Sequence, residues 1–289
     1  MRALLVFATV FLSAILAGAL LAYPVYEFFA SSGALPFRKV VSRTTQLSGL
    51  LFSLLYFCYY RGLSLQGLGL RFERGHICLL QGLAAGFAVV ALIAANLVLL
   101  GVHDLNESRL FSFSALSQLL LTALLTGLLV GIVEELMFRG ALLGGLSRQT
   151  NQAVALALVS LVYAAVHYLK FRDLPADAAI HWYTGITMLP AALFQFADPA
   201  RYDAMLTLFF LGLLLGLIRL YTGNLLLCIG LHAGVVSGEK LVQHVADFMP
   251  YSPHAHLVNR FDPFIGNLAS VWLLAVSVVF YFACRAKKV

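Results

Sequence analysis

The stretch Leu129-Val-Gly-Ile-Val-Glu-Glu-Leu-Met-Phe-Arg-Gly140 places two carboxylates and one guanidinium inside a long apolar run. A charged side chain at membrane depth costs at least about 2.5–3.5 kcal/mol on insertion scales, so each of these groups needs a compensating role. Glu135 and Arg139 are four residues apart, so they share one helix face and can pair. Glu134 is rotated by about 100° from Glu135. This geometry assigns support to Glu135 and leaves Glu134 for chemistry.

The composition around this stretch is that of an integral membrane protein. The chain has 289 residues, of which 61% are hydrophobic and only 11% are charged, and its mean hydropathy is +0.91. Soluble domains carry about 25% charged residues. Because the apolar runs leave no room for a sizeable soluble domain, we expect one integral-membrane domain over residues 1–289.

Eight apolar runs follow one another along the chain. Helices are the only plausible spanning element, since lipid offers backbone groups no hydrogen-bond partners. The second and fifth runs are short for a span, which needs about 20 residues. We therefore expect an all-α polytopic bundle of about eight transmembrane helices. The runs lie at about 3–24, 44–60, 77–102, 115–147, 152–168, 204–222, 224–246 and 265–284.

Several functional classes are excluded by what the sequence lacks. The net charge of +6 comes from basic residues placed singly or in pairs between apolar runs, which is typical of membrane-flanking loops and not of a nucleic-acid surface. The four cysteines form no CxxC pair, so neither a disulfide framework nor a zinc knuckle is expected. HExxH and GxSxG motifs are also absent. The sequence predicts no nucleic-acid partner and no cofactor.

The loops give a weak indication of orientation. With eight spans, the loops on each side of the membrane hold nine Lys and Arg residues, so the positive-inside rule gives a tie. The loops on the side of the termini are shorter and poor in acidic residues, which favours cytoplasmic termini. Basic residues on that side include Arg71, Arg74, Arg148 and Arg219.

The segment 169–203 differs from the other connections. Its ends are charged, its centre is apolar and aromatic, and Gly185 and Pro190 interrupt it. An interfacial or re-entrant helix pair fits this pattern better than a full span. Two interpretations stay open: a loop that lies on the membrane, or a gate that admits substrate.

Two histidines, His167 and His232, lie within apolar runs. If the helices on both sides of a turn near 148–151 are straight, Glu134 and His167 each lie ~20–25 Å from that turn, at similar depth. His232 is only eight residues beyond Asn224, so its depth agrees less well and a kink in its helix would be needed. The three side chains are candidates for one site.

These residues resemble two motifs of the CPBP family, which contains the CAAX proteases and the bacteriocin-processing enzymes. The EExxxR motif is complete as Glu134, Glu135 and Arg139. The FxxxH motif is present from Tyr163 to His167, with Tyr in place of Phe. The resemblance implies that Glu134 and His167 activate a water molecule that attacks the scissile peptide bond.

The third family motif, HxxxN/D, is incomplete. His232 is present, but Val236 occupies the position of the Asn or Asp. In the family, this pair would stabilise the oxyanion, and the loss of one such donor can cost about 10²–10³ in rate. Either the Gly234 amide or Asn224 would have to substitute, or the enzyme is weak or specialised. The resemblance extends over about residues 115–240.

The resemblance predicts an intramembrane glutamic endopeptidase that cleaves a membrane-associated protein or peptide, with a cut near the substrate's C-terminus as one option. It implies a multi-pass protein of the bacterial inner membrane, with the lipid bilayer and the substrate as its partners. The implied catalytic residues are Glu134, His167 and His232. The implied supporting residues are Glu135, Arg139 and Tyr163.

Two alternatives remain open. A zinc-dependent membrane peptidase could use His167, His232 and a glutamate as ligands, because zinc prefers three protein ligands and a water. A non-catalytic immunity or scaffold protein could keep the same constellation for stability.

Overall fold

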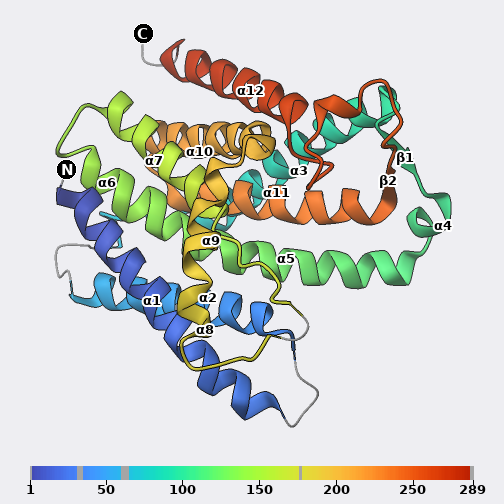
Figure 1. The fold of residues 1–289 in the computed structure, drawn as a ribbon. Helices are drawn as coiled ribbons and strands as arrows, with labels where there is room; N and C mark the ends of the chain where they lie inside the picture. The colour runs from blue at the N-terminus through green and yellow to red at the C-terminus, as the bar shows by residue number, and fades with distance from the viewer. Residues whose placement is uncertain (1, 31–34, 60–64, 176–177, 287–289) are drawn as a thin grey trace. The chain divides into compact units, whose positions relative to one another are not determined.

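The computed structural model describes residues 2–30, 35–59, 65–175 and 178–286 (Figure 1). All eight apolar runs fold into helices, and six helical stretches within the described ranges are long and apolar enough to cross a membrane. The all-α polytopic bundle is confirmed, whereas the count of eight spans is not. The six stretches are Arg2–Phe29, Gly75–Leu99, Phe113–Leu146, Pro199–Thr222, Leu225–Val245 and Asn267–Ala286.

The second and fifth runs account for the difference. The helix of the fifth run, α7 (Gln152–His167), has only 16 residues. The helix of the second run, α2 (Phe37–Tyr59), has 23 residues but begins with the basic sequence Phe-Arg-Lys. The other long helices are α1 (Arg2–Ala30), α3 (Gly75–Leu99), α5 (Phe113–Glu135), α10 (Tyr202–Thr222), α11 (Leu225–Val245) and α12 (Asn267–Ala286).

The chain forms two compact units. The first comprises Met1–Leu63 and Ala165–Pro199, and the second comprises Ser64–Ala164 and Ala200–Val289. A single integral-membrane domain over residues 1–289 stays a prediction.

In the first unit, α1 and α2 pack together closely at Gly18. A Cβ at this glycine would collide with the backbone of Thr45. The neighbouring buried Thr44 hydroxyl donates to the Gly18 carbonyl at 2.7 Å, which adds a polar contact between the two helices. On another face of α1, Gly185 lies against the carbonyl of Ala19.

The segment 169–203 contains two short helices, α8 (Thr184–Thr187) and α9 (Leu189–Leu193), and two 3₁₀ turns, η2 (Phe194–Ala197) and η3 (Pro199–Arg201). None of these elements is long enough to span a membrane. Trp182 is 62% exposed next to them, as expected of an aromatic residue at a membrane interface. Whether the segment acts as a gate stays a prediction.

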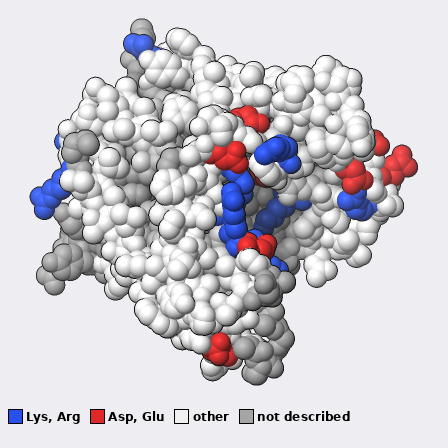
Figure 2. All heavy atoms as spheres, in the orientation of Figure 1, with Lys and Arg blue, Asp and Glu red and all other residues white. Residues whose placement is uncertain are grey.

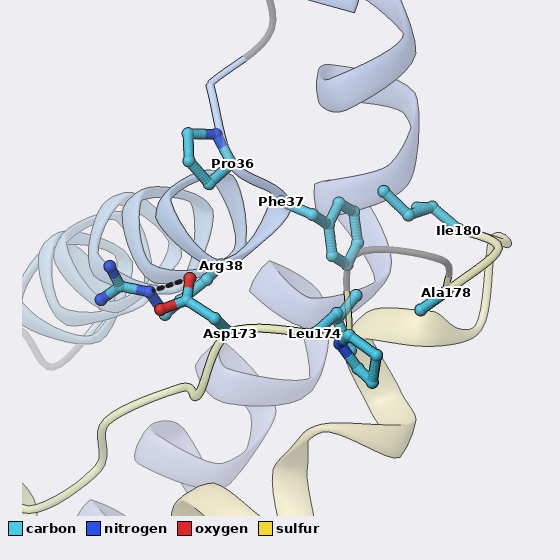
Figure 3. A pocket seen from close by; sticks show the side chains of 8 residues that line it. Pro36, Phe37, Arg38, Asp173, Leu174, Ala178 and Ile180 are labelled. Atoms are coloured by element: carbon cyan, nitrogen blue, oxygen red, sulfur yellow. Dashed lines mark hydrogen bonds and ion pairs between the residues drawn. The ribbon is translucent and has the colours of Figure 1, made fainter.

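The same unit has a small pocket where this segment meets the start of α2 (Figure 3). Its walls are mostly apolar, with Phe37 and Leu174 on facing sides, and its volume is about 180 Å³. The Arg38 Nε donates to Asp173 Oδ1 at 2.7 Å at one edge. Both of these charged side chains are well exposed, so their pairing contributes little to stability.

In the second unit, α11 lies between α3 and α5, and its contact with α3 depends on glycines of both helices. A Cβ at Gly230 or Gly234 would meet the carbonyls of Leu79 or Leu83 in α3, and a Cβ at Gly82 would meet the backbone of α11. Small residues of this kind let membrane helices approach closely. Gly230 and Gly234 therefore serve this packing, as the small-residue spacing indicates.

We expect Gly230→Ala to destabilise the protein by more than the 1–3 kcal/mol that is typical of overpacking. The reason is that the added methyl group meets a backbone carbonyl, which cannot move aside. Thermal unfolding in detergent measures the effect. Gly144→Ala is the control, because a Cβ there meets no atom within 4 Å and alanine favours the helix. Equal melting temperatures for the two variants would contradict the close packing of Gly230 against α3.

A small cap closes one end of α3 and α11. Strand β1 (His103–Leu105) pairs antiparallel with β2 (Ala246–Phe248), and the short helix α4 (Glu107–Leu110) follows β1. Arg109 forms an ion pair with Asp247, whose pKa is lowered mainly by this hydrogen-bonded contact. Carboxylates and basic groups are visible together over this end in Figure 2.

The cap is expected to lose stability as the pH falls through the range of His103. Its Nε2–H donates to the Pro263 carbonyl at 2.8 Å, and its buried Nδ1 has no hydrogen-bond partner among the described residues. Burial lowers the pKa of His103 below its ordinary value of 6.5.

Because the pKa of His103 is lower in the folded protein, the unfolded chain binds a proton at this histidine more readily. The resulting loss of folding stability is absent above pH 6.5 and grows as the pH falls below it. Melting temperatures between pH 8 and pH 5 would measure it. His103→Gln is expected to flatten the acid limb, and an unchanged acid limb would refute the assignment.

Candidate active site

The regular α-helical periodicity is broken at the site by a π-helical segment. Helix α5 ends at Glu135, the π-helix η1 (Leu136–Leu142) follows, and α6 (Leu143–Leu146) completes the stretch. Such segments are rare and occur frequently at functional sites. The depth predicted for Glu134 assumed a continuous α-helix, and this assumption is wrong over the π-helical residues.

The predicted pair of Glu135 and Arg139 is present. Arg139 Nη1 donates to Glu135 Oε1 at 2.8 Å, and both side chains are fully buried. Arg139 Nη2 also donates to the Gly212 carbonyl of α10 at 3.2 Å. This additional hydrogen bond offsets part of the cost of burying the pair, although Glu135 Oε2 and Arg139 Nε have no hydrogen-bond partner among the described residues.

Tyr163 of α7 forms the next part of the site. The guanidinium carbon of Arg139 lies 4.3 Å from the centre of its ring, a distance at which a cation is attracted to the aromatic face. Phe138 packs edge-on against the same ring, with 5.2 Å between centroids. Gly212 makes room for this arrangement, since a Cβ there would lie 3.2 Å from the Tyr163 ring.

His232 connects the two glutamates. Its Nδ1 lies 2.9 Å from Glu135 Oε1, and its Nε2 lies 3.8 Å from Glu134 Oε2. The second distance is too long for a hydrogen bond. Both Glu134 and the Nε2 of His232 are nevertheless close enough to contact the same reacting atom. Helix α11 is one uninterrupted α-helix over Leu225–Val245, which includes His232.

The two glutamates differ in exposure as well as in partners. The Glu135 side chain is fully buried, whereas that of Glu134 is 24% exposed. Arg139, Glu135, His232 and Glu134 therefore form a series of contacts in this order. Glu134 is the member of the series whose side chain is partly exposed. This arrangement agrees with the division of roles that helical rotation predicts.

His167 is the last residue of α7, four residues after Tyr163. It belongs to the first unit, whereas the other five predicted site residues belong to the second. The structure thus brings together five of the six. The approach of His167 to Glu134 stays a prediction.

Asn224 and the Gly234 amide, the two groups expected to replace the missing oxyanion donor, both have other roles in the structure. Asn224 caps the start of α11, where its side-chain oxygen accepts from the Leu226 amide at 2.9 Å. The Gly234 amide lies inside α11, and this glycine faces Leu83 of α3. Val236 is half-buried one turn beyond His232.

Two further features of the site were not predicted. The Gly212 carbonyl accepts from Arg139, and Phe138 supports Tyr163. Gly212 stands out in the sequence as part of a small-residue pair with Gly216, but that spacing indicates only close helix packing.

Within the described ranges, no group of three or more His, Cys, Asp or Glu side chains is arranged to hold a metal ion. The zinc alternative stays open, and direct metal analysis tests it.

A family model described as Type II CAAX prenyl endopeptidase Rce1-like matches residues 116–237. Residues 116–237 are therefore similar to the Rce1-like family. The match runs from α5 into α11 and includes all six predicted site residues, so the resemblance to the CPBP family is confirmed. The similarity of residues 116–237 to this family supports a protease and implies a protein substrate in the membrane. Comparisons with curated proteins and with solved structures found no match.

Proposed function

We propose that this Rce1-like protein is a glutamate-dependent intramembrane endopeptidase. The observation that supports it best is the position of Glu134, a partly exposed carboxylate 3.8 Å from a histidine ring. That ring is fixed from its other side by the buried pair of Glu135 and Arg139. A reactive carboxylate beside a fixed histidine is the arrangement that general acid–base catalysis needs.

In the proposed reaction, Glu134 accepts a proton from a water molecule as its oxygen attacks the scissile carbonyl carbon. The carbonyl oxygen becomes an oxyanion, and the Nε2–H of His232 stabilises it. When the C–N bond breaks, Glu134 returns the proton to the leaving amine. Glu135 holds His232 in place through Nδ1, Arg139 holds Glu135, and the Tyr163 ring packs against the Arg139 guanidinium.

His167 enters this proposal through the FxxxH resemblance alone. We assign it a role beside Glu134 in orienting the attacking water. Because Val236 cannot donate a hydrogen bond, His232 is the side chain proposed to stabilise the oxyanion. We therefore expect slower turnover than at a site with two donors.

The substrate class is proposed from the family description. Because the matching family is named for CAAX prenyl endopeptidases, we infer a peptide bond near the C-terminus of a membrane-attached protein. Six apolar helices in the described part of the chain support an enzyme that is embedded in the bilayer. The proposed location is the bacterial inner membrane.

The experiment that tests this function is cleavage by the full chain in proteoliposomes. Peptides ending in a CAAX sequence, with and without a prenyl group, are the probes, and mass spectrometry identifies the products. We expect protein that contains no bound zinc to cleave the peptides, and we expect this cleavage to persist in the presence of a chelator. Activity lost with a chelator and restored by zinc would replace the glutamic mechanism with the zinc alternative. Absence of cleavage of every peptide would favour the non-catalytic alternative.

A further inference from the structure

A second cluster of charge lies where α10 ends and α11 begins, outside the candidate active site. The loop of residues 65–74 packs against this turn, and the Leu225 amide donates to the Gly69 carbonyl at 2.8 Å. This contact places the loop beside the N-terminus of α11, a helix of 21 residues. The N-terminus of a helix carries partial positive charge.

Two arginines meet at this turn. The guanidinium groups of Arg71 and Arg219 lie 3.3 and 3.9 Å from the point that a Cβ of Gly223 would occupy. Gly69 packs directly on the Arg219 guanidinium. Both glycines have positive φ angles, 86° for Gly69 and 64° for Gly223, a conformation that glycine adopts without strain.

No carboxylate offsets these two charges among the residues that the structure describes. Arg38, Arg109 and Arg139 each pair with an acidic side chain. Glu73, the one carboxylate in the loop, makes no ion pair with Arg71 or Arg219.

Arg219 itself is incompletely satisfied. Its Nη2 reaches the Gly67 carbonyl only at 3.4 Å, and its buried Nε has no hydrogen-bond partner within the described part of the chain. Two guanidinium groups this close repel each other, and an anion between them would remove that cost. Planar guanidinium groups bind phosphate oxygens in pairs of hydrogen bonds.

We propose that Arg71 and Arg219 form a binding site for a phosphate group, supplied by the headgroup of an anionic lipid. The surroundings favour a lipid over a free ion. Leu65 and Phe72 of the same loop are 58% and 66% exposed, and α3, which starts at Gly75, is an apolar candidate span. The site thus lies where apolar side chains and basic groups occur together, as at the headgroup level of a bilayer.

The test uses the full-length protein, delipidated in detergent, with three probes at equal ionic strength: phosphatidylglycerol, phosphatidylcholine and inorganic phosphate. Phosphatidylglycerol is expected to raise the melting temperature, whereas phosphatidylcholine is not. Arg71→Gln is expected to weaken the apparent affinity for phosphatidylglycerol about tenfold or more, the loss expected of a charge-assisted hydrogen bond. Arg71 is exposed, so this variant should fold even if Arg219→Gln does not.

Arg148→Gln is the matched control, since Arg148 is exposed at the α6–α7 turn and lies outside the pair. An equal loss of lipid affinity in this control would overturn the site, because it would show attraction to surface charge alone. An unchanged affinity in Arg71→Gln would also overturn it. If inorganic phosphate alone reproduces the shift and Arg71→Gln abolishes it, the phosphate site is supported and its assignment to a lipid is overturned.

Discussion

Glu134→Gln is expected to lower the rate of peptide cleavage by about 10²–10⁴-fold, the usual contribution of general acid–base catalysis. Glutamine has nearly the same shape as glutamate but cannot take a proton from water. Because Glu134 is partly exposed, its replacement leaves no buried charge unpaired. The melting temperature should therefore stay close to that of the unchanged protein.

Single-turnover cleavage in proteoliposomes, measured beside thermal unfolding, separates activity from stability. Glu239→Gln is the control, because Glu239 lies on α11 and accepts from Gln243 at an exposed position. Cleavage at the full rate by a folded Glu134→Gln protein would refute the proposed mechanism.

Arg139→Met should destabilise the protein by about 3–5 kcal/mol, the usual cost when a buried ion pair loses one partner. Glu135 would stay fully buried without the cation that is now 2.8 Å away. His232 is held by the same Glu135 oxygen, so the ring is expected to lose its fixed position as well. Thermal or denaturant-induced unfolding in detergent measures the change.

Two comparisons make the Arg139 result specific. Adding Glu135→Gln removes the unpaired charge, so the double variant should recover part of the lost stability. Arg38→Met breaks an exposed ion pair and is expected to cost no more than about 1 kcal/mol. Equal losses from Arg38→Met and Arg139→Met would show that burial of the Arg139 pair does not matter.

Most of the fold follows from hydropathy. Each apolar run of the sequence became a helix, since a helix satisfies its own backbone groups in lipid. The number of spans did not follow as simply, because α2 begins with basic residues and α7 is short. The close pairing of α3 with α11 was not predicted. Gly230 and Gly234 of α11 and Gly82 and Gly86 of α3 have the same four-residue spacing, and this spacing does not identify the partner helix.

For the candidate site, local contacts were easier to predict than tertiary ones. The pairing of Glu135 with Arg139 depends on helical spacing within one segment, and it is present. The hydrogen bond between His232 and Glu135 joins residues 97 positions apart. Simple counting of helical rise placed His232 at a different depth, because neither the π-helix nor the register of α11 against α5 is visible in the sequence.

The π-helix η1 also affects how this segment tolerates changes in length. A π turn holds more residues than an α turn, so removing one residue from 136–142 could restore regular α-helix. Because the deletion would remove the residue that widens the turn, the later side chains of the stretch would keep roughly their present directions. A deletion from the regular helix α5 would instead turn every later side chain by about 100°. The π-helical residues are therefore the part of this span where a change in length disturbs the directions of the buried charges least.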